Sequence, residues 1–318
     1  MLRQVFLRAL LPCPLTSFPS PRWSGITVPQ ALISNVARTS ESVGTLTEDI
    51  VRALRFSRLS FPASENASVS WRGSGYPGYD IGFSAVTLDL TTPWYDVLQK
   101  SIMGGVPVIV LQRYLFDDPG GHFRVVYGFN STHIFTKDPW GRGGQPEDFI
   151  LTYADFTTLW HYTESAEKGP RFQGVSAVPW RLTITPPTAA PTQGSNSQIG
   201  VFYTYESPFA SNAMKDSVKA DRVILEIQYD PTIWLAQTSS IVVSTHFSLG
   251  ETHNGSFNLT CLASSVACQT SSVSIRASGI VSGSVPPAVR YGSLKYPGYE
   301  YVDVIGSMWK ELRFSGRK

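Results

Sequence analysis

Two neighbouring stretches, PVIVLQ at Pro107–Gln112 and GHFRVVYGF at Gly121–Phe129, decide how the middle of the chain folds. The first is a continuous apolar run with the length of a buried strand, and His122–Tyr127 predicts a second strand that opens directly after two glycines. A third run, Thr132–Thr136, predicts another strand, which ends at Lys137-Asp138-Pro139. Together these runs predict an antiparallel sheet.

His122 opens the second of these predicted strands, and Asp138 lies just past the third. Antiparallel pairing of the two strands brings both residues to the same end of the sheet. A histidine held by a carboxylate is the base that activates a cysteine or serine nucleophile, because the acceptor fixes the tautomer and stabilises the imidazolium. A histidine at a strand end and a turn-forming Asp-Pro are also common without any catalytic role. Spacing alone therefore leaves both interpretations open.

Helical patterns surround the predicted strands. We expect helices at Val28–Val36, Thr45–Leu54 and Trp94–Met103 before them, and at Tyr153–Trp160 after them. Helices followed by an antiparallel sheet are typical of an α+β domain.

The C-terminal half has a different texture. Thr185–Gln198 is rich in Pro, Thr, Ser and Gly, which indicates a linker, and the β-branched and aromatic runs after it predict an antiparallel β-sandwich. The predicted organisation is an atypical N-terminal segment at 1–24, a first domain at 25–180, a linker at 181–198 and a β-sandwich domain at 199–318. A length of 318 residues accommodates two cores.

The motifs of the first domain occur in a familiar order. They are GVPVIVL at Gly105–Leu111, GHFRVVYGF at Gly121–Phe129, DPWG at Asp138–Gly141 and LTYADFTTLW at Leu151–Trp160. This succession, over about Gly25–Trp160, resembles the C39-like family of papain-like cysteine peptidases. The resemblance implies a papain-like fold, hydrolysis of peptide bonds by a thiol, and a peptide or protein substrate. It makes His122 the catalytic base and Asp138 the acid that orients it.

The nucleophile region departs from this pattern. The family places a cysteine at the start of its first long helix, after a glutamine that stabilises the oxyanion. Cys13 lies at about the right distance before Gly25, but Pro19 and Pro21 follow it and would break a helix. Three explanations are open: Cys13 is the nucleophile of a diverged helix, the domain has lost its nucleophile, or residues 1–24 come from a mis-assigned exon or frameshift. The abrupt loss of the pattern before residue 25 favours the third.

Composition and charge exclude several functions. The net charge is +2 without a long basic cluster, so we expect no nucleic-acid partner, and no apolar run is long enough for a transmembrane helix. The spacing of His133, His161, His246 and His253 predicts no metal site, and we expect no cofactor.

Other residues bear on location. Sequons at Asn66, Asn130, Asn254 and Asn258 favour an extracellular, lysosomal or secretory location, and Cys261 and Cys268 are close enough to form a disulfide there. The main alternatives to a peptidase are a catalytically inactive C39-like binding module and a secreted adhesion or structural glycoprotein. The partner of the predicted β-sandwich domain is unknown.

Overall fold

A computed structural model gives the structure of the chain. It describes the following residues: 33, 36–37, 39, 44–56, 60–62, 84–104, 106–139, 147–163, 169–178, 180–205, 219–243, 247–248, 250–282, 289–291, 294–296, 301–306 and 309–314. The chain divides into two compact units, Met1–Val178 with Ser284–Tyr301, and Pro179–Gly283 with Val302–Lys318.

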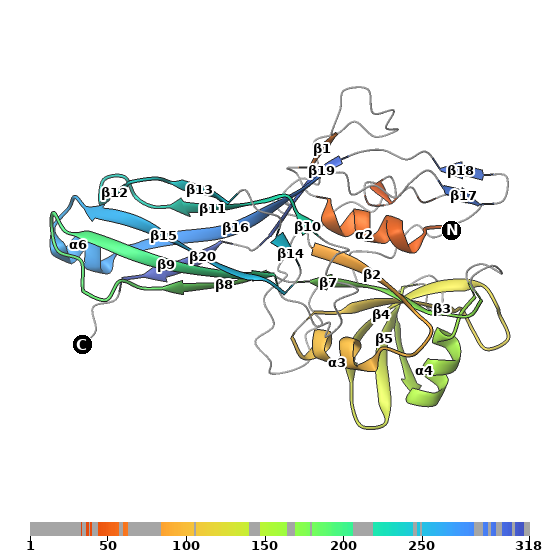
Figure 1. The fold of residues 1–318 in the computed structure, drawn as a ribbon. Coiled ribbons are helices and arrows are strands. Elements are labelled where there is room, and N and C mark those ends of the chain that lie inside the picture. Colours follow the sequence, from red (N-terminus) through yellow and green to blue (C-terminus); the bar gives the residue numbers. More distant parts are fainter. Residues whose placement is uncertain are drawn as a thin grey trace. The chain divides into compact units, whose positions relative to one another are not determined.

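An antiparallel sheet forms the centre of the first unit (Figure 1). Its strand order is β2-β7-β3-β4-β5-β6. Its strands are β2 (Ser84–Leu90), β3 (Val108–Arg113), β4 (Gly121–Phe129), β5 (His133–Asp138), β6 (Glu147–Thr152) and β7 (Phe172–Val178). The register sets Gln112 opposite His122, and Val126 opposite Thr136 before a shift in the β4–β5 pairing. The sheet also joins strands that are far apart in the sequence, because β2 pairs with β7.

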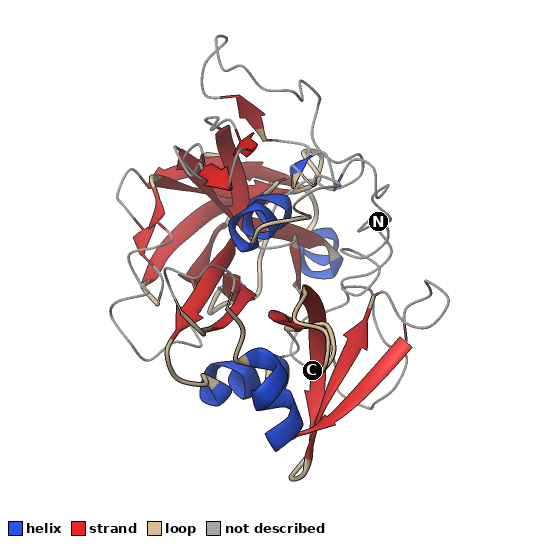
Figure 2. Cartoon of the chain, turned by 90° about the vertical axis from the view of Figure 1, so that its right-hand side faces the viewer, coloured by secondary structure: helices blue, strands red, loops and turns tan. Residues whose placement is uncertain are grey.

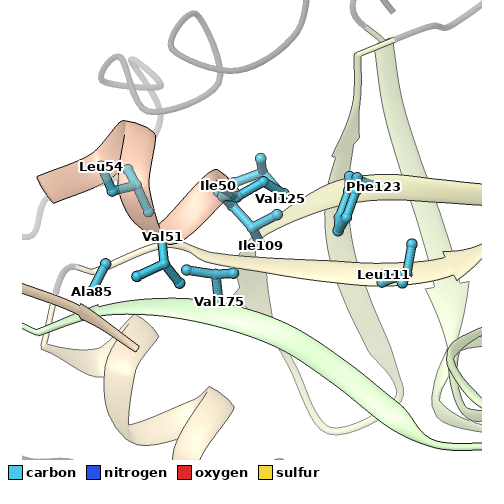
Figure 3. Close-up of a cluster of buried hydrophobic side chains, with 9 residues drawn as sticks. All are labelled: Ile50, Val51, Leu54, Ala85, Ile109, Leu111, Phe123, Val125 and Val175. Carbon is cyan, nitrogen blue, oxygen red and sulfur yellow. The ribbon is translucent and has the colours of Figure 1, made fainter. Parts of the chain in front are cut away.

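One face of this sheet packs against helix α2 (Thr47–Arg55). The helix directs an apolar stripe at the sheet, because residues three and four apart share one face of a helix. Figure 3 shows the resulting cluster, which consists of Ile50, Val51, Leu54, Ala85, Ile109, Leu111, Phe123, Val125 and Val175. Burial of these side chains holds the helix on the sheet.

The opposite face packs against α3 (Tyr95–Met103) and α4 (Tyr153–Trp160). Trp94 and Trp160 meet edge to face with ring centroids 4.6 Å apart, and each indole N–H donates to a backbone carbonyl of β7. Thr152 caps α4 by accepting a hydrogen bond from the backbone N–H of Asp155. Helices thus cover both faces, and the side chains that alternate along β3 and β4 are buried on either side.

Two further antiparallel sheets make up most of the second unit. One has the order β12-β15-β9-β8, and in the other β16 pairs with β19, β11 and β20 while β11 also pairs with β13. The strands are β8 (Trp180–Thr185), β9 (Asn196–Tyr205), β11 (Arg222–Gln228), β12 (Trp234–Ala236), β13 (Ser240–Val243), β15 (Thr252–Cys261), β16 (Ser272–Ser282), β19 (Tyr301–Gly306) and β20 (Lys310–Arg313). The sheets face each other, since a Cβ on Gly255 of β15 would lie 2.7 Å from Leu225 of β11.

Short elements complete the described chain. They are β1 (Phe61–Pro62), β10 (Lys219–Ala220), β14 (Phe247–Ser248), α6 (Ser265–Thr270), β17 (Val289–Tyr291) and β18 (Leu294–Tyr296). Strand β10 pairs with β14, and β17 pairs with β18. Among the described helices, none combines the length and the apolarity needed to cross a bilayer.

The predicted fold class, an α+β papain-like domain followed by an antiparallel β-sandwich, is wrong. Strands dominate the described chain, as Figure 2 shows in red, and helices are few and short. The expected helices at 45–54, 94–103 and 153–160 do form, but β2, β6 and β7 add three strands to the three that the sequence predicted. The result is a mostly β protein built on antiparallel sheets.

The boundaries also differ from those expected. The first unit ends at Val178, and 284–301 belong with it, whereas β8 lies within the residues that the sequence assigned to the end of the first domain and to the linker. Most of the helix expected at Val28–Val36 and all of residues 1–24 lie outside the described residues.

Candidate functional site

His122 is the second residue of β4, and only 3% of its surface is exposed. Alternation along the strand directs His122 and Arg124 to one face of the sheet and Phe123 and Val125 to the face that α2 covers. The imidazole therefore lies on the α3 and α4 side of the sheet. Gln112, which is opposite it on β3, donates a hydrogen bond to the carbonyl of Phe156 in α4.

Asp138 meets His122 at the end of β5, as the sequence predicted. The imidazole Nε2 and the carboxylate Oδ1 are 2.8 Å apart, and the two side chains are 3% and 6% exposed. Because a carboxylate only accepts hydrogen bonds, Nε2 carries the proton that it donates to Asp138. In the neutral ring the basic lone pair is then on Nδ1.

Arg124 completes the site, and sequence analysis did not select it. Its Nε donates to the second carboxylate oxygen of Asp138 at 2.7 Å, so one carboxylate binds both the imidazole and the guanidinium. Burial lowers the pKa of Arg124, and the attraction of Asp138 opposes that shift. A signal was available, because an arginine inside the apolar run GHFRVVYGF must be paired once the strand is buried.

Strand β3 and the residue after it supply the other neighbours of the site. The ring of Tyr114 stands edge-on to His122, with centroids 4.9 Å apart. Gln112 accepts a hydrogen bond from Arg124 through its side-chain oxygen at 3.3 Å. The site is therefore a connected polar cluster of four buried side chains, Gln112, Arg124, Asp138 and His122.

The third expected site residue, Cys13, lies outside the described residues. Cys261 and Cys268 form a disulfide, so Cys13 is the cysteine that remains of the three in the sequence. Within the described part of the chain, no group of three or more His, Cys, Asp or Glu side chains could hold a metal ion. The chemistry that the described site offers is that of a buried, oriented imidazole base.

Comparisons with known proteins add little. No protein-family model matches the chain, and no curated protein matches it. Two solved structures are similar at 11% identity and a TM-score of 0.19. The match to "The crystal structure of Ly7917 with the hydrolyzing product of MDP" covers 77% of this chain and 69% of that chain. The match to "The crystal structure of Ly7917" covers 90% of this chain and 94% of that chain. A TM-score this low does not indicate a shared fold, so function has to be argued from the site.

Proposed function

We propose that the protein is a cysteine peptidase in which Cys13 attacks a peptide carbonyl, His122 acts as base and then acid, and Asp138 orients the imidazole. One observation carries this proposal, the buried hydrogen bond of 2.8 Å between His122 Nε2 and Asp138 Oδ1. Among the residues on which the resemblance to C39-like peptidases rests, His122 and Asp138 are the two to which it gives a catalytic role. The proposal rests on the pair and not on a papain-like fold.

The chemistry follows from the tautomer. With the Nε2 proton donated to Asp138, Nδ1 can accept the thiol proton, and the carboxylate stabilises the imidazolium that forms. The same Nδ1 proton then passes to the leaving amine when the tetrahedral intermediate collapses. Water hydrolyses the acyl-enzyme in a second round of the same proton transfers.

Alkylation of Cys13 tests this function without knowledge of the substrate. The intact, non-reduced protein is treated with iodoacetamide over a range of pH, and the rate at Cys13 is read by peptide mass spectrometry. We expect rapid reaction at about pH 6, where a free thiol of pKa near 8.5 is mostly protonated. His122→Ala should slow the reaction at least about tenfold, because a positioned base contributes about 10²–10⁴-fold.

His133→Ala is the matched control. That histidine opens β5, where its Nδ1 bonds the hydroxyl of Thr132, and its loss should leave the rate unchanged. A wild-type rate typical of an ordinary thiol, with no effect of His122→Ala, would overturn the peptidase proposal for this chain. Hydrolysis of a mixed peptide library, lost in Cys13→Ala, is the complementary result that supports it.

We further propose a secreted or lysosomal location. The Cys261–Cys268 disulfide supports it, because such bonds persist in oxidising compartments. The sequon residues Asn130 and Asn258 are exposed, as an acceptor of a glycan must be. Expression through a eukaryotic secretory pathway should give a protein that loses mass on treatment with peptide N-glycosidase. An unchanged mass would contradict this location.

A further inference from the structure

The guanidinium of Arg124 uses all three of its nitrogens. Nε binds Asp138, Nη1 donates to the backbone carbonyl of Arg113 at 3.2 Å as well as to Gln112, and Nη2 donates to the carbonyl of Tyr114 at 2.6 Å. The residue is 1% exposed. Each of these bonds reaches another strand or the residue just after one, so Arg124 joins β4 to the end of β3 and to the end of β5.

The orientation of the guanidinium plane is also fixed. Its central carbon lies 4.4 Å from the ring centroid of Phe149 in β6, a contact that favours a cation over an aromatic face. The hydrogen bonds around the edge of the guanidinium and the Phe149 ring on its face together hold it in one orientation. Arg124 is thus a rigid part of the site and not a mobile counter-charge.

Two groups that contact His122 depend on this rigid arginine. Asp138 offers Oδ1 to the imidazole while its Oδ2 is held by Arg124 Nε. Tyr114, whose ring lies edge-on to the imidazole, is held at its backbone carbonyl by Nη2. A carboxylate bound at both oxygens cannot rotate, so the direction of the His122 hydrogen bond is set by Arg124.

We infer that Arg124 is the positioning residue of the site. It holds Asp138 and Tyr114 so that His122 keeps its proton on Nε2 and presents the basic lone pair at Nδ1. The role in catalysis rests on the proposed function, but the control of the imidazole tautomer does not depend on Cys13. The two statements can therefore fail separately.

Arginine is required here for a geometric reason. A lysine at the same position would keep the charge but has one nitrogen, which cannot reach a carboxylate and two successive carbonyls from a fixed plane. Arg124→Lys consequently removes the positioning while it leaves the counter-charge of Asp138. It is the variant that separates the two roles.

Nitrogen-15 NMR of the histidine rings gives a direct readout. The His122 signals are assigned by their loss in His122→Gln, and spectra are recorded above about pH 8, where model imidazoles are neutral. We expect the wild type to show the Nε2–H tautomer. In Arg124→Lys the signals should move toward the average of the two tautomers, and the His122-dependent alkylation rate of Cys13 should fall about tenfold, part of what a positioned base contributes.

Arg276→Lys is the matched control. Arg276 has the same two contacts in the other unit, an Nε bond to Glu226 at 2.6 Å and a ring, Trp309, at 4.6 Å. Its replacement should disturb only its own unit and leave the His122 signals in place. A folded Arg124→Lys protein with wild-type His122 signals would overturn the inference.

A second variant tests the same inference in case Arg124→Lys does not fold. Gln112→Met conserves volume and removes one acceptor of Arg124 Nη1, and we expect a smaller shift of the His122 signals in the same direction. Unchanged signals in this variant would also contradict the inference. A His122 tautomer that follows Arg124, in a protein whose Cys13 reacts as an ordinary thiol, would support the positioning role and reject the peptidase.

Discussion

At the scale of single residues, sequence and structure agree on one pair within the polar cluster on β3, β4 and β5, namely His122 and Asp138. The meeting of His122 and Asp138 was predictable, because antiparallel pairing of adjacent strands brings these positions to one end of the sheet. The contribution of Arg124 became visible only in the folded chain. Two of its partners at the end of β3 are backbone carbonyls, and carbonyls carry no sequence signal.

Asp138→Asn should strongly destabilise the first unit. The amide keeps the size of the side chain but leaves Arg124 buried without its counter-charge, a change that costs about 3–5 kcal/mol. Urea unfolding measures the loss. Asp148→Asn is the control, since its ion pair with Lys137 is 50% and 29% exposed and should contribute no more than about 1 kcal/mol. Equal effects of the two changes would argue against a buried ion pair.

Tyr203→Phe should leave the second unit equally stable or more stable. The tyrosine is buried and its ring stacks with those of Phe247 and His253, and its hydroxyl has no hydrogen-bond partner among the described residues. Removing an unsatisfied buried hydroxyl recovers about 1–2 kcal/mol. A loss of stability in thermal unfolding would mean that the hydroxyl has a partner.

The same residue predicts a dependence on pH. Burial raises the pKa of Tyr203, so the folded state favours the protonated phenol, whereas an unfolded tyrosine ionises near pH 10. Its contribution to stability is therefore present below about pH 10 and is lost as the pH rises through the higher folded value. Tyr203→Phe should therefore reduce the fall in the free energy of unfolding at alkaline pH. If the fall is the same in the variant, groups other than Tyr203 cause it.

At the scale of elements, helices were predicted better than strands. Periodicity located α3 and α4 within one residue or two, because a helix is determined by local sequence. The sequence analysis did not predict strands β2 and β7. Strand β2 pairs with a partner far along the chain, and β7 contains Gly174, which weakens a strand pattern. Pairing over such distances depends on the whole fold.

Gly174 has a steric role in β7. A Cβ at this position would lie 2.5 Å from the carbonyl oxygen of Ile109 and 3.0 Å from the ring of Trp94. Gly174→Ala should therefore destabilise the first unit by about 1–3 kcal/mol, as overpacking does. Gly200→Ala is the control in β9, where the nearest atom would be 3.4 Å away, and it should cost less than about 1 kcal/mol. Calorimetry that ranks the two in reverse order would contradict this assignment.

At the scale of the whole molecule, each of the two compact units has its own buried residues. We expect two unfolding transitions in calorimetry. The Cys261–Cys268 disulfide closes a short loop in the second unit, where its loss should cost about 2 kcal/mol. Reduction should lower the transition of that unit and leave the other in place. A single transition that shifts as a whole would show that the units unfold together.

The sequence by itself determined the short-range features of this protein: three of its helices, the strands around His122, the contact of His122 with Asp138 and the closeness of Cys261 to Cys268. These follow from periodicity and from spacing along the chain, which act over a few residues. Only the tertiary structure decided that the protein is mostly β, that the first sheet has six strands and that Arg124 holds the site together. The reason is physical, because strand pairing and the burial of a charge depend on residues far apart in the chain, and local patterns do not record which of them meet.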